Sequence, residues 1–192
     1  MQPRNKKKKF KFAKKNKTFT LHGVLTDYDD YGRCKIVFRD KYYLKEKPEK
    51  FGKTINGLYK DPTRNCINNI EKYMVSSFNQ QFEDKGNLFD VDELKENNLW
   101  KSAINPDGDS FKIKMDFLEP FREKSTRYGD KNKYFKIPEC LTYEGEIITE
   151  IKQLINKNVK IKARPRKFEF EGNQGKKIYG WSLDLVELRQ QI

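Results

Sequence analysis

The chain of 192 residues has few of the side chains that catalysis and metal binding most often use. It contains one histidine, His22, and three cysteines, Cys34, Cys66 and Cys140, which lie far apart and form no C-x-x-C pair. This spacing excludes a zinc-finger pattern and a disulfide framework. An odd number of dispersed cysteines is typical of a reducing compartment, so we expect an intracellular protein, in the cytoplasm or a host nucleus, and not a secreted one.

Long apolar runs and phosphate-binding loops are also absent. No stretch approaches the roughly 20 apolar residues of a membrane span, and the N-terminus lacks the apolar region of a secretory signal. The Gly-bearing segment EGNQGKK does not have the spacing of a nucleotide-binding loop. We therefore expect no membrane contact and no nucleotide cofactor.

Acidic residues gather only beside turns. Asp27, Asp29 and Asp30 fit a turn better than a calcium loop, because no later Gly and Glu complete that pattern. The triplet of Asp107, Asp109 and Asp116 could serve a metal-dependent nuclease, but acids beside turns are too ordinary to support an enzyme. His22 has no serine or cysteine partner nearby in the sequence. The expectation is no enzyme, no cofactor and no metal.

Positive charge is abundant, with a formal net charge of +13. Nine of the 41 Lys and Arg residues fall in residues 1–17, which contain no acid, and the other 32 accompany 28 acidic residues. We expect residues 1–17 to be a disordered basic arm. It could lie on nucleic acid, direct nuclear import or only solubilise the chain.

The stretch from Asn158 to Leu188 carries the clearest pattern. Val159, Ile161 and Ala163 alternate with cations, which predicts a strand with one buried and one positive face. Aromatic residues flank this strand and the next one, and a basic groove bordered by rings is how proteins hold single-stranded nucleic acid. A solvated strand face with core aromatics is the alternative.

Further elements follow from hydrophobic spacing. We expect strands at 18–26, 33–38 and 110–117, helices at 63–78, 90–100 and 145–158, and a polar loop at 122–133. Gly23 suggests a bulge or tight bend in the first strand. The two earlier helices would form an insertion at about 46–108 within a single domain spanning 18–192.

Without this insertion the order is β-β-β-α-β-β. That is the order of a five-stranded Greek-key barrel of the oligonucleotide-binding (OB) kind, so the expected fold class is mainly β, an OB-fold-like barrel. A mixed α+β sheet is the alternative.

The segments LINKN, VKIKARPRKFEFEG and YGWSLDLVEL, within residues 146–188, carry a family resemblance. They resemble the end of the replicative single-stranded DNA-binding proteins of bacteriophages and large DNA viruses. In those families a basic strand, a Gly-rich turn and a Gly-aromatic final strand close an OB barrel. The resemblance implies binding of single-stranded DNA in replication, recombination or repair, without sequence preference. It does not extend to tail-mediated recruitment of partners, because the chain ends ELRQQI and not in an acidic tail.

The expected function is therefore single-stranded DNA binding, with RNA binding or a virion protein that neutralises packaged nucleic acid as alternatives. Replication proteins are further candidate partners, and the oligomeric state is open. Trp181 shares its strand parity with Leu183 and Leu185, so a core position is the alternative for its ring. The candidate contact residues are the cations Lys160, Lys162, Arg164, Arg166, Lys176, Lys177, Arg33, Lys35, Arg39, Lys112 and Lys114, and the aromatic residues Phe168, Phe170, Tyr179, Trp181, Tyr42 and Tyr43, with Tyr28 and Tyr31 beside them.

Overall fold

Strands dominate the computed structural model, which describes residues 17–29, 33–42, 54–55, 58–59, 61–114, 139–148 and 151–191. Residues 1–16 of the basic arm, Tyr31, Tyr43, Asp116 and the loop 122–133 lie outside the described residues. The elements in chain order are β1 (Phe19–Tyr28), β2 (Arg33–Val37), α1 (Arg39–Tyr42), β3 (Thr54–Ile55), β4 (Leu58–Tyr59), α2 (Pro62–Asp84), α3 (Val91–Glu96), β5 (Trp100–Lys101), β6 (Ser110–Lys114), β7 (Glu139–Leu141), the 3-10 turn η3 (Ile151–Leu154), β8 (Lys157–Glu171), the 3-10 turn η4 (Asn173–Gly175) and β9 (Lys177–Gln190).

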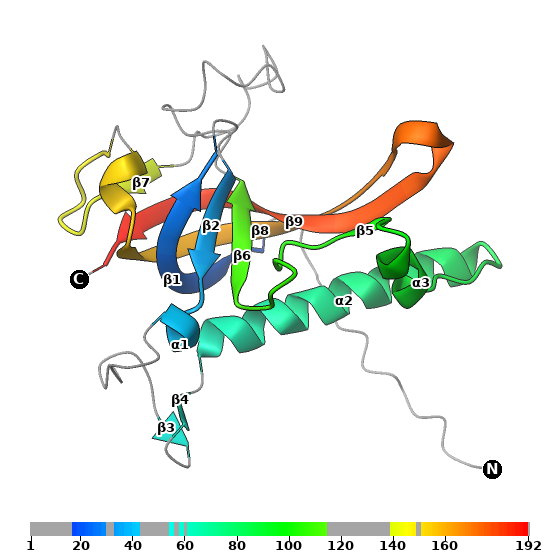
Figure 1. Ribbon diagram of the computed structural model, residues 1–192, viewed down its shortest axis with the longest axis horizontal. Coiled ribbons are helices and arrows are strands. Elements are labelled where there is room, and N and C mark those ends of the chain that lie inside the picture. Colours follow the sequence, from blue (N-terminus) through cyan, green and yellow to red (C-terminus); the bar gives the residue numbers. More distant parts are fainter. Residues whose placement is uncertain are drawn as a thin grey trace.

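Seven of these strands form one mixed sheet whose pairing returns to its starting strand (Figure 1). β1 pairs with β2, β2 with β6, β6 with β9, β9 with β8, and β8 with β1. The pairs that β9 makes with β5, β6 and β7 are parallel, and the other pairs are antiparallel. The expectation of a mainly β fold is confirmed, and the pairing forms a ring of five strands.

The period-two pattern decides which face of each strand is buried. Val159 and Ile161 of β8 are fully buried, as are Phe111 and Ile113 of β6. The residues between them carry the cations and reach solvent. Each fully buried side chain of this kind contributes about 1.5–3 kcal/mol to folding, so burial of this one face fixes the register of the ring.

The first hairpin is confirmed, but the bulge predicted at Gly23 lies two residues farther along β1. The pairing of β1 with β2 shifts between Leu25 and Asp27, and Gly23 itself keeps regular pairing with β8. A Cβ at Gly23 would lie 2.3 Å from Cγ2 of Ile36. Gly23 is therefore needed for the close packing of two strands, and the bend comes from the bulge that follows it.

The predicted helix at 63–78 is confirmed and extends to Asp84 as α2. Pro62 occupies the first turn, where its missing N–H costs nothing, and the Asp61 carboxylate accepts a hydrogen bond from the Thr63 N–H. Its buried side consists of Thr63, Ile67, Ile70, Met74 and Phe78.

The helix predicted at 90–100 is shorter than expected. α3 ends at Glu96, and Asn98 adopts a positive φ of 56°. Trp100 then enters β5 and pairs with Tyr179 of β9, so its burial comes from the sheet and not from a helix.

The helix predicted at 145–158 is wrong. Gly145 adopts a φ of 93° in a turn, Ile147 bridges back to Leu141, and the Ile148 N–H donates to the Cys140 carbonyl. Among the described residues of this segment, only those of η3 are helical before β8 begins. The isoleucine spacing suited a helix, but β-branched residues also favour strands, and the glycine in the left-handed region turns the chain back on β7.

Candidate nucleic-acid interface

The outer faces of four neighbouring strands carry one row of charged side chains. Arg33 of β2 lies opposite Lys114 of β6, Lys114 opposite Asp184 of β9, and Asp184 opposite Arg164 of β8. The row alternates with buried residues of the same strands, namely Cys34, Ile113, Ala163, Leu183 and Leu185, so it points away from the core. We call the face that bears this row the cationic face.

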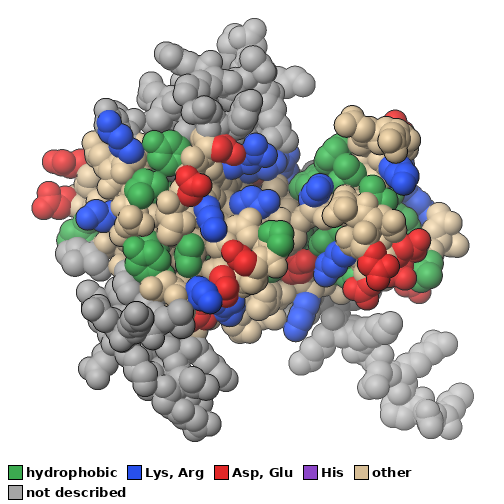
Figure 2. All heavy atoms as spheres, in the orientation of Figure 1, with side chains coloured by type: hydrophobic (Ala, Val, Ile, Leu, Met, Phe, Trp, Pro, Cys, Tyr) green, Lys and Arg blue, Asp and Glu red, His purple; other side chains and the backbone are tan. Residues whose placement is uncertain are grey.

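A second pair of cations lies beside this row, because Lys35 is opposite Lys112. Both Lys35 and Lys112 are exposed. Figure 2 shows Lys and Arg side chains over β2 and β6 and in the hollow next to the hairpin of β8 and β9.

Like charges directly opposite each other destabilise a sheet. Here two such pairs are adjacent, Arg33 with Lys114 and Lys35 with Lys112. Partial desolvation of its amine lowers the pKa of Lys112 although the residue is exposed overall, and the nearby charges of Arg33 and Lys101 lower it further. A bound anion would relieve this repulsion.

Two aromatic rings border the cationic face on the β8–β9 hairpin. The ring centroids of Phe168 and Phe170 are 5.9 Å apart, and Phe170 is 50% exposed. The Lys114 Nζ lies 5.8 Å from the centroid of Phe168, which places the rings next to the row of cations. Arg166 lies on the same side of β8 and pairs with Asp184 at 2.9 Å. Rings and cations that the sequence predicted separately thus share one surface.

Two residues predicted to stack on bases, Tyr179 and Trp181, are buried and so are not available for stacking. Trp181 is 1% exposed and Tyr179 is 9% exposed. The Tyr179 ring meets those of Phe78 and Phe82 edge-on at 5.5 and 5.4 Å. The alternative considered for Trp181, a core position, is the one the structure has, because its parity matches that of the apolar residues of β9.

The inner side of the hairpin rests on α2, which runs below it in Figure 1. The Lys167 Nζ donates to Ser77 Oγ at 3.0 Å and to Gln81 Oε1 at 2.8 Å, and lies 4.5 Å from the centroid of Phe78. These contacts hold the hairpin in place beyond the ring of strands.

Glu71 of α2 makes a further set of contacts that sequence reasoning missed. Its carboxylate accepts hydrogen bonds from Trp181 Nε1 at 2.7 Å, from Trp100 Nε1 at 3.1 Å and from the Ser102 hydroxyl. One acidic side chain thereby joins α2 to β9 and to β5. Its half-buried position on the apolar side of α2 is the signal that could have identified it.

Several predicted contact residues lie away from the cationic face. Arg39 is 7% exposed and its Nη2 donates to Gln191 Oε1, because α1 packs against β1. Tyr42, on the same short helix, is exposed. Lys160 and Lys162, by contrast, alternate with the buried Val159 and Ile161 and share the outer side of β8 with Arg164. They lie farther along the strand, where the Lys162 Nζ is 3.8 Å from Glu187 and Lys160 is opposite His22 of β1.

The remaining two cations, Lys176 and Lys177, are exposed where the hairpin turns. The turn places Gln174 and Gly175 at positive φ, which allows the two long strands to reverse within a few residues. These lysines extend the positive charge of the hairpin beyond Phe170.

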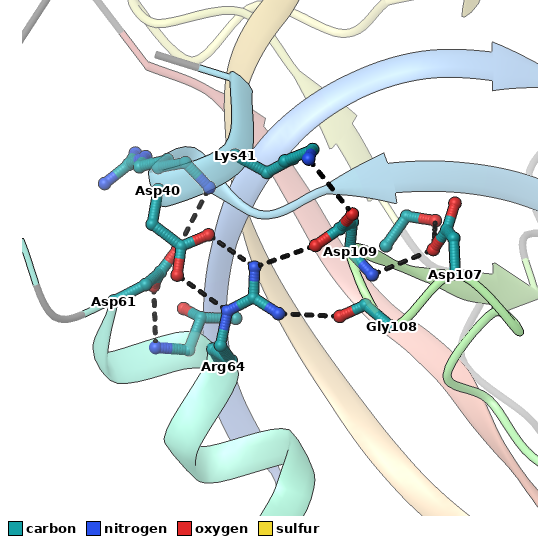
Figure 3. Close-up of polar contacts among 10 residues, drawn as sticks. Asp40, Lys41, Asp61, Arg64, Asp107, Gly108 and Asp109 are labelled. Atoms are coloured by element: carbon teal, nitrogen blue, oxygen red, sulfur yellow. Dashed lines mark hydrogen bonds and ion pairs between the residues drawn. The ribbon is translucent and has the colours of Figure 1, made fainter. Parts of the chain in front are cut away.

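A network around Arg64 fixes the turn that precedes β6 (Figure 3). The Arg64 guanidinium binds both oxygens of Asp40 at 2.6 Å and donates to the Gly108 carbonyl at 2.6 Å. Asp109 accepts from Arg64 at 3.5 Å and pairs with Lys41 at 3.4 Å. The acidic residues of this region therefore anchor a turn, and Asp40 holds the pKa of Arg64 above its ordinary value.

Within the described ranges, no three His, Cys, Asp or Glu side chains come together as a metal site requires. No helix in the same ranges has the length and apolar character to cross a membrane. The His22 Nδ1–H donates to Gln191 Oε1 at 3.0 Å, and burial lowers the pKa of His22.

Protein-family models, curated proteins and solved structures were compared with the chain, and none of them matches.

Proposed function

We propose that this protein binds single-stranded DNA on the cationic face, with an OB-type barrel as its fold. The ring of β1, β2, β6, β9 and β8 supports a small closed barrel. In OB folds, oligonucleotides bind across the second and third strands and the loops beside them. The second and third strands of this ring are β2 and β6, and they carry the opposed cation pairs. The helix expected between the third and fourth strands is reduced to η3.

One observation supports the proposal best, namely that the cation pairs share one surface with the exposed ring of Phe170 and the half-buried ring of Phe168. Each lysine or arginine can neutralise a phosphate and release counterions, which makes binding fall as salt rises. Phe168 and Phe170 can stack on bases, and stacking requires bases that are free of a complementary strand. Together they favour a single strand over a duplex.

The mechanism assigns a separate energetic role to each group. A stacked base contributes about 1–3 kcal/mol, so Phe170→Ala should weaken binding about tenfold with little change in salt dependence. Replacing Lys114 and Arg164 together by Ala should reduce the salt slope by about 1.4, because each phosphate contact on a single strand contributes roughly 0.7.

The direct test is fluorescence anisotropy of a labelled dT oligonucleotide at two or more salt concentrations. A labelled oligonucleotide is needed because both tryptophans, Trp100 and Trp181, are buried and would report stacking only indirectly. The variants are Phe170→Ala and the Lys114/Arg164 double Ala variant, with the exposed Lys72→Ala of α2 as the control for lost charge. Equal binding by all variants would exclude the cationic face as the site.

The same assay separates the alternatives. Matched dT, rU and duplex oligonucleotides distinguish a DNA-binding from an RNA-binding protein. A chain lacking residues 1–16 should keep salt-sensitive binding to dT if the face is the site. Complete loss of affinity in that truncated chain would instead favour an arm that only neutralises nucleic acid.

A further inference from the structure

A hollow of about 390 Å³ lies at one end of the cationic face, between the end of the first hairpin and the turn before β6. Its volume falls in the range of small-ligand sites. It is lined by Asp27, Tyr28, Asp29, Arg33, Cys34, Lys35, Asn105, Pro106, Asp107 and Lys112.

The charge of this hollow differs from that of the row beside it. Three carboxylates and three cations line it, so their formal charges balance. Outside the hollow, the cationic face has three cations, Lys114, Arg164 and Arg166, for one carboxylate, Asp184. A phosphate would lie more favourably in the row, because carboxylates repel it. The hollow suits a group with both hydrogen-bond donors and acceptors.

The hollow contains donors and acceptors that no described residue uses. Asp29 uses both oxygens on Arg33, at 3.0 and 2.8 Å. Asp27 and Asp107 each use only Oδ1, on the N–H of Tyr28 and on Asp109 and Ser110 respectively. No described residue donates to Oδ2 of Asp27 or of Asp107, and none accepts from Lys35 or Lys112.

The turn that carries Asp107 is held in place. Its Oδ1 accepts from the Asp109 N–H at 2.8 Å, and the adjacent Gly108 carbonyl accepts from Arg64 (Figure 3). An acceptor held by such contacts loses little freedom when a ligand binds.

We propose that the hollow takes one guanine base of the bound strand and gives the protein a preference for guanine. This inference rests on the proposed function. Guanine presents two adjacent donors, N1–H and the N2 amine, to a carboxylate of Asp107 or Asp27. It also presents O6 and N7 as acceptors, which lysines bind. Thymine has one N–H, and adenine has an acceptor at N1 that a carboxylate repels.

The experiment compares labelled 12-mers of dT with 12-mers in which one central dT is replaced by dG, dA, dC or deoxyinosine. We expect the dG oligonucleotide to bind about tenfold more tightly than dT. Deoxyinosine, which lacks the N2 amine, should lie between them. Equal affinity for dG and dA would mean that purine stacking alone explains any preference and would overturn the inference.

Two variants test the carboxylates. Asp107→Asn and Asp27→Asn should reduce the preference for dG while leaving dT binding unchanged, because Asn keeps the acceptor for the turn and replaces the second oxygen by a donor. Asp92→Asn on α3 is the matched control. A dG preference that survives both substitutions refutes the site. If dT binds but no base is preferred, only this inference fails; if no oligonucleotide binds, the proposed function fails with it.

Discussion

Replacing Glu71 should loosen the support of the β8–β9 hairpin. This half-buried carboxylate accepts hydrogen bonds from the indoles of Trp100 and Trp181 and from the Ser102 hydroxyl. Trp181 is 1% exposed, so in Glu71→Ala its buried N–H would lose its acceptor.

The expected loss follows from these contacts. A hydrogen bond to a charged acceptor contributes about 1.5–3 kcal/mol, and a buried donor left unpaired costs about 1–3 kcal/mol. Because the three bonds share one acceptor and do not add independently, we expect Glu71→Ala to lose about 3 kcal/mol. In a chain of this size that lowers Tm by about 6–12 °C. Glu71→Gln retains one carbonyl acceptor and should lose about half as much.

Urea unfolding followed by far-UV circular dichroism measures the free energy of unfolding for both variants. The exposed Glu83→Ala, on the same helix, controls for helix propensity and should change stability by less than about 0.5 kcal/mol. Affinity for dT should fall in Glu71→Ala in folded protein, because Phe168 and Phe170 depend on the hairpin. A Glu71→Ala midpoint equal to that of the control would refute the reasoning.

Three further predictions concern other sites. Burial holds the pKa of His22 below its ordinary value of 6.5, so the unfolded chain binds the proton more readily than the folded protein does. The free energy of unfolding should therefore fall as the pH drops below about 6.5. His22→Gln should remove that part of the pH dependence, as measured by urea unfolding. Burial raises the pKa of Cys140 to about 12 and also raises that of Cys34, so neither should react with a thiol reagent at pH 8 until the protein unfolds. A Cβ in Gly180→Ala would lie 2.1 Å from the Lys101 carbonyl oxygen; we expect a loss of about 1–3 kcal/mol, and an unchanged urea midpoint would contradict this close approach.

Sequence patterns predicted the elements whose burial follows their own periodicity. The alternation in β8 and the hydrophobic spacing of α2 are local features, and each is confirmed. The segment at 145–158 was mispredicted because isoleucines at helical spacing are equally suited to a strand and a turn. Its structure depends on pairing with β7, which local spacing does not contain.

In the candidate site too, local sequence predicts the type of residue but not the partner that lies next to it. Arg33 and Lys114 could be identified as strand cations, but their position opposite each other depends on the register between β2 and β6. Arg39 looked equally suited to phosphate binding, yet it is buried beside Gln191, far away in sequence. Glu71 was missed because its partners lie on two strands that follow it in the chain.

The ring of strands has a consequence for synthesis on the ribosome. Phe19 of β1 pairs with Ala163, and Lys114 of β6 pairs with Asp184. Both early strands can therefore form these pairs only after residues near the end of the chain have been synthesised. Such distant pairing slows folding and leaves strand edges uncovered in the nascent chain. Until the residues from Lys157 onward have emerged, the first three strands of the ring need shielding from aggregation.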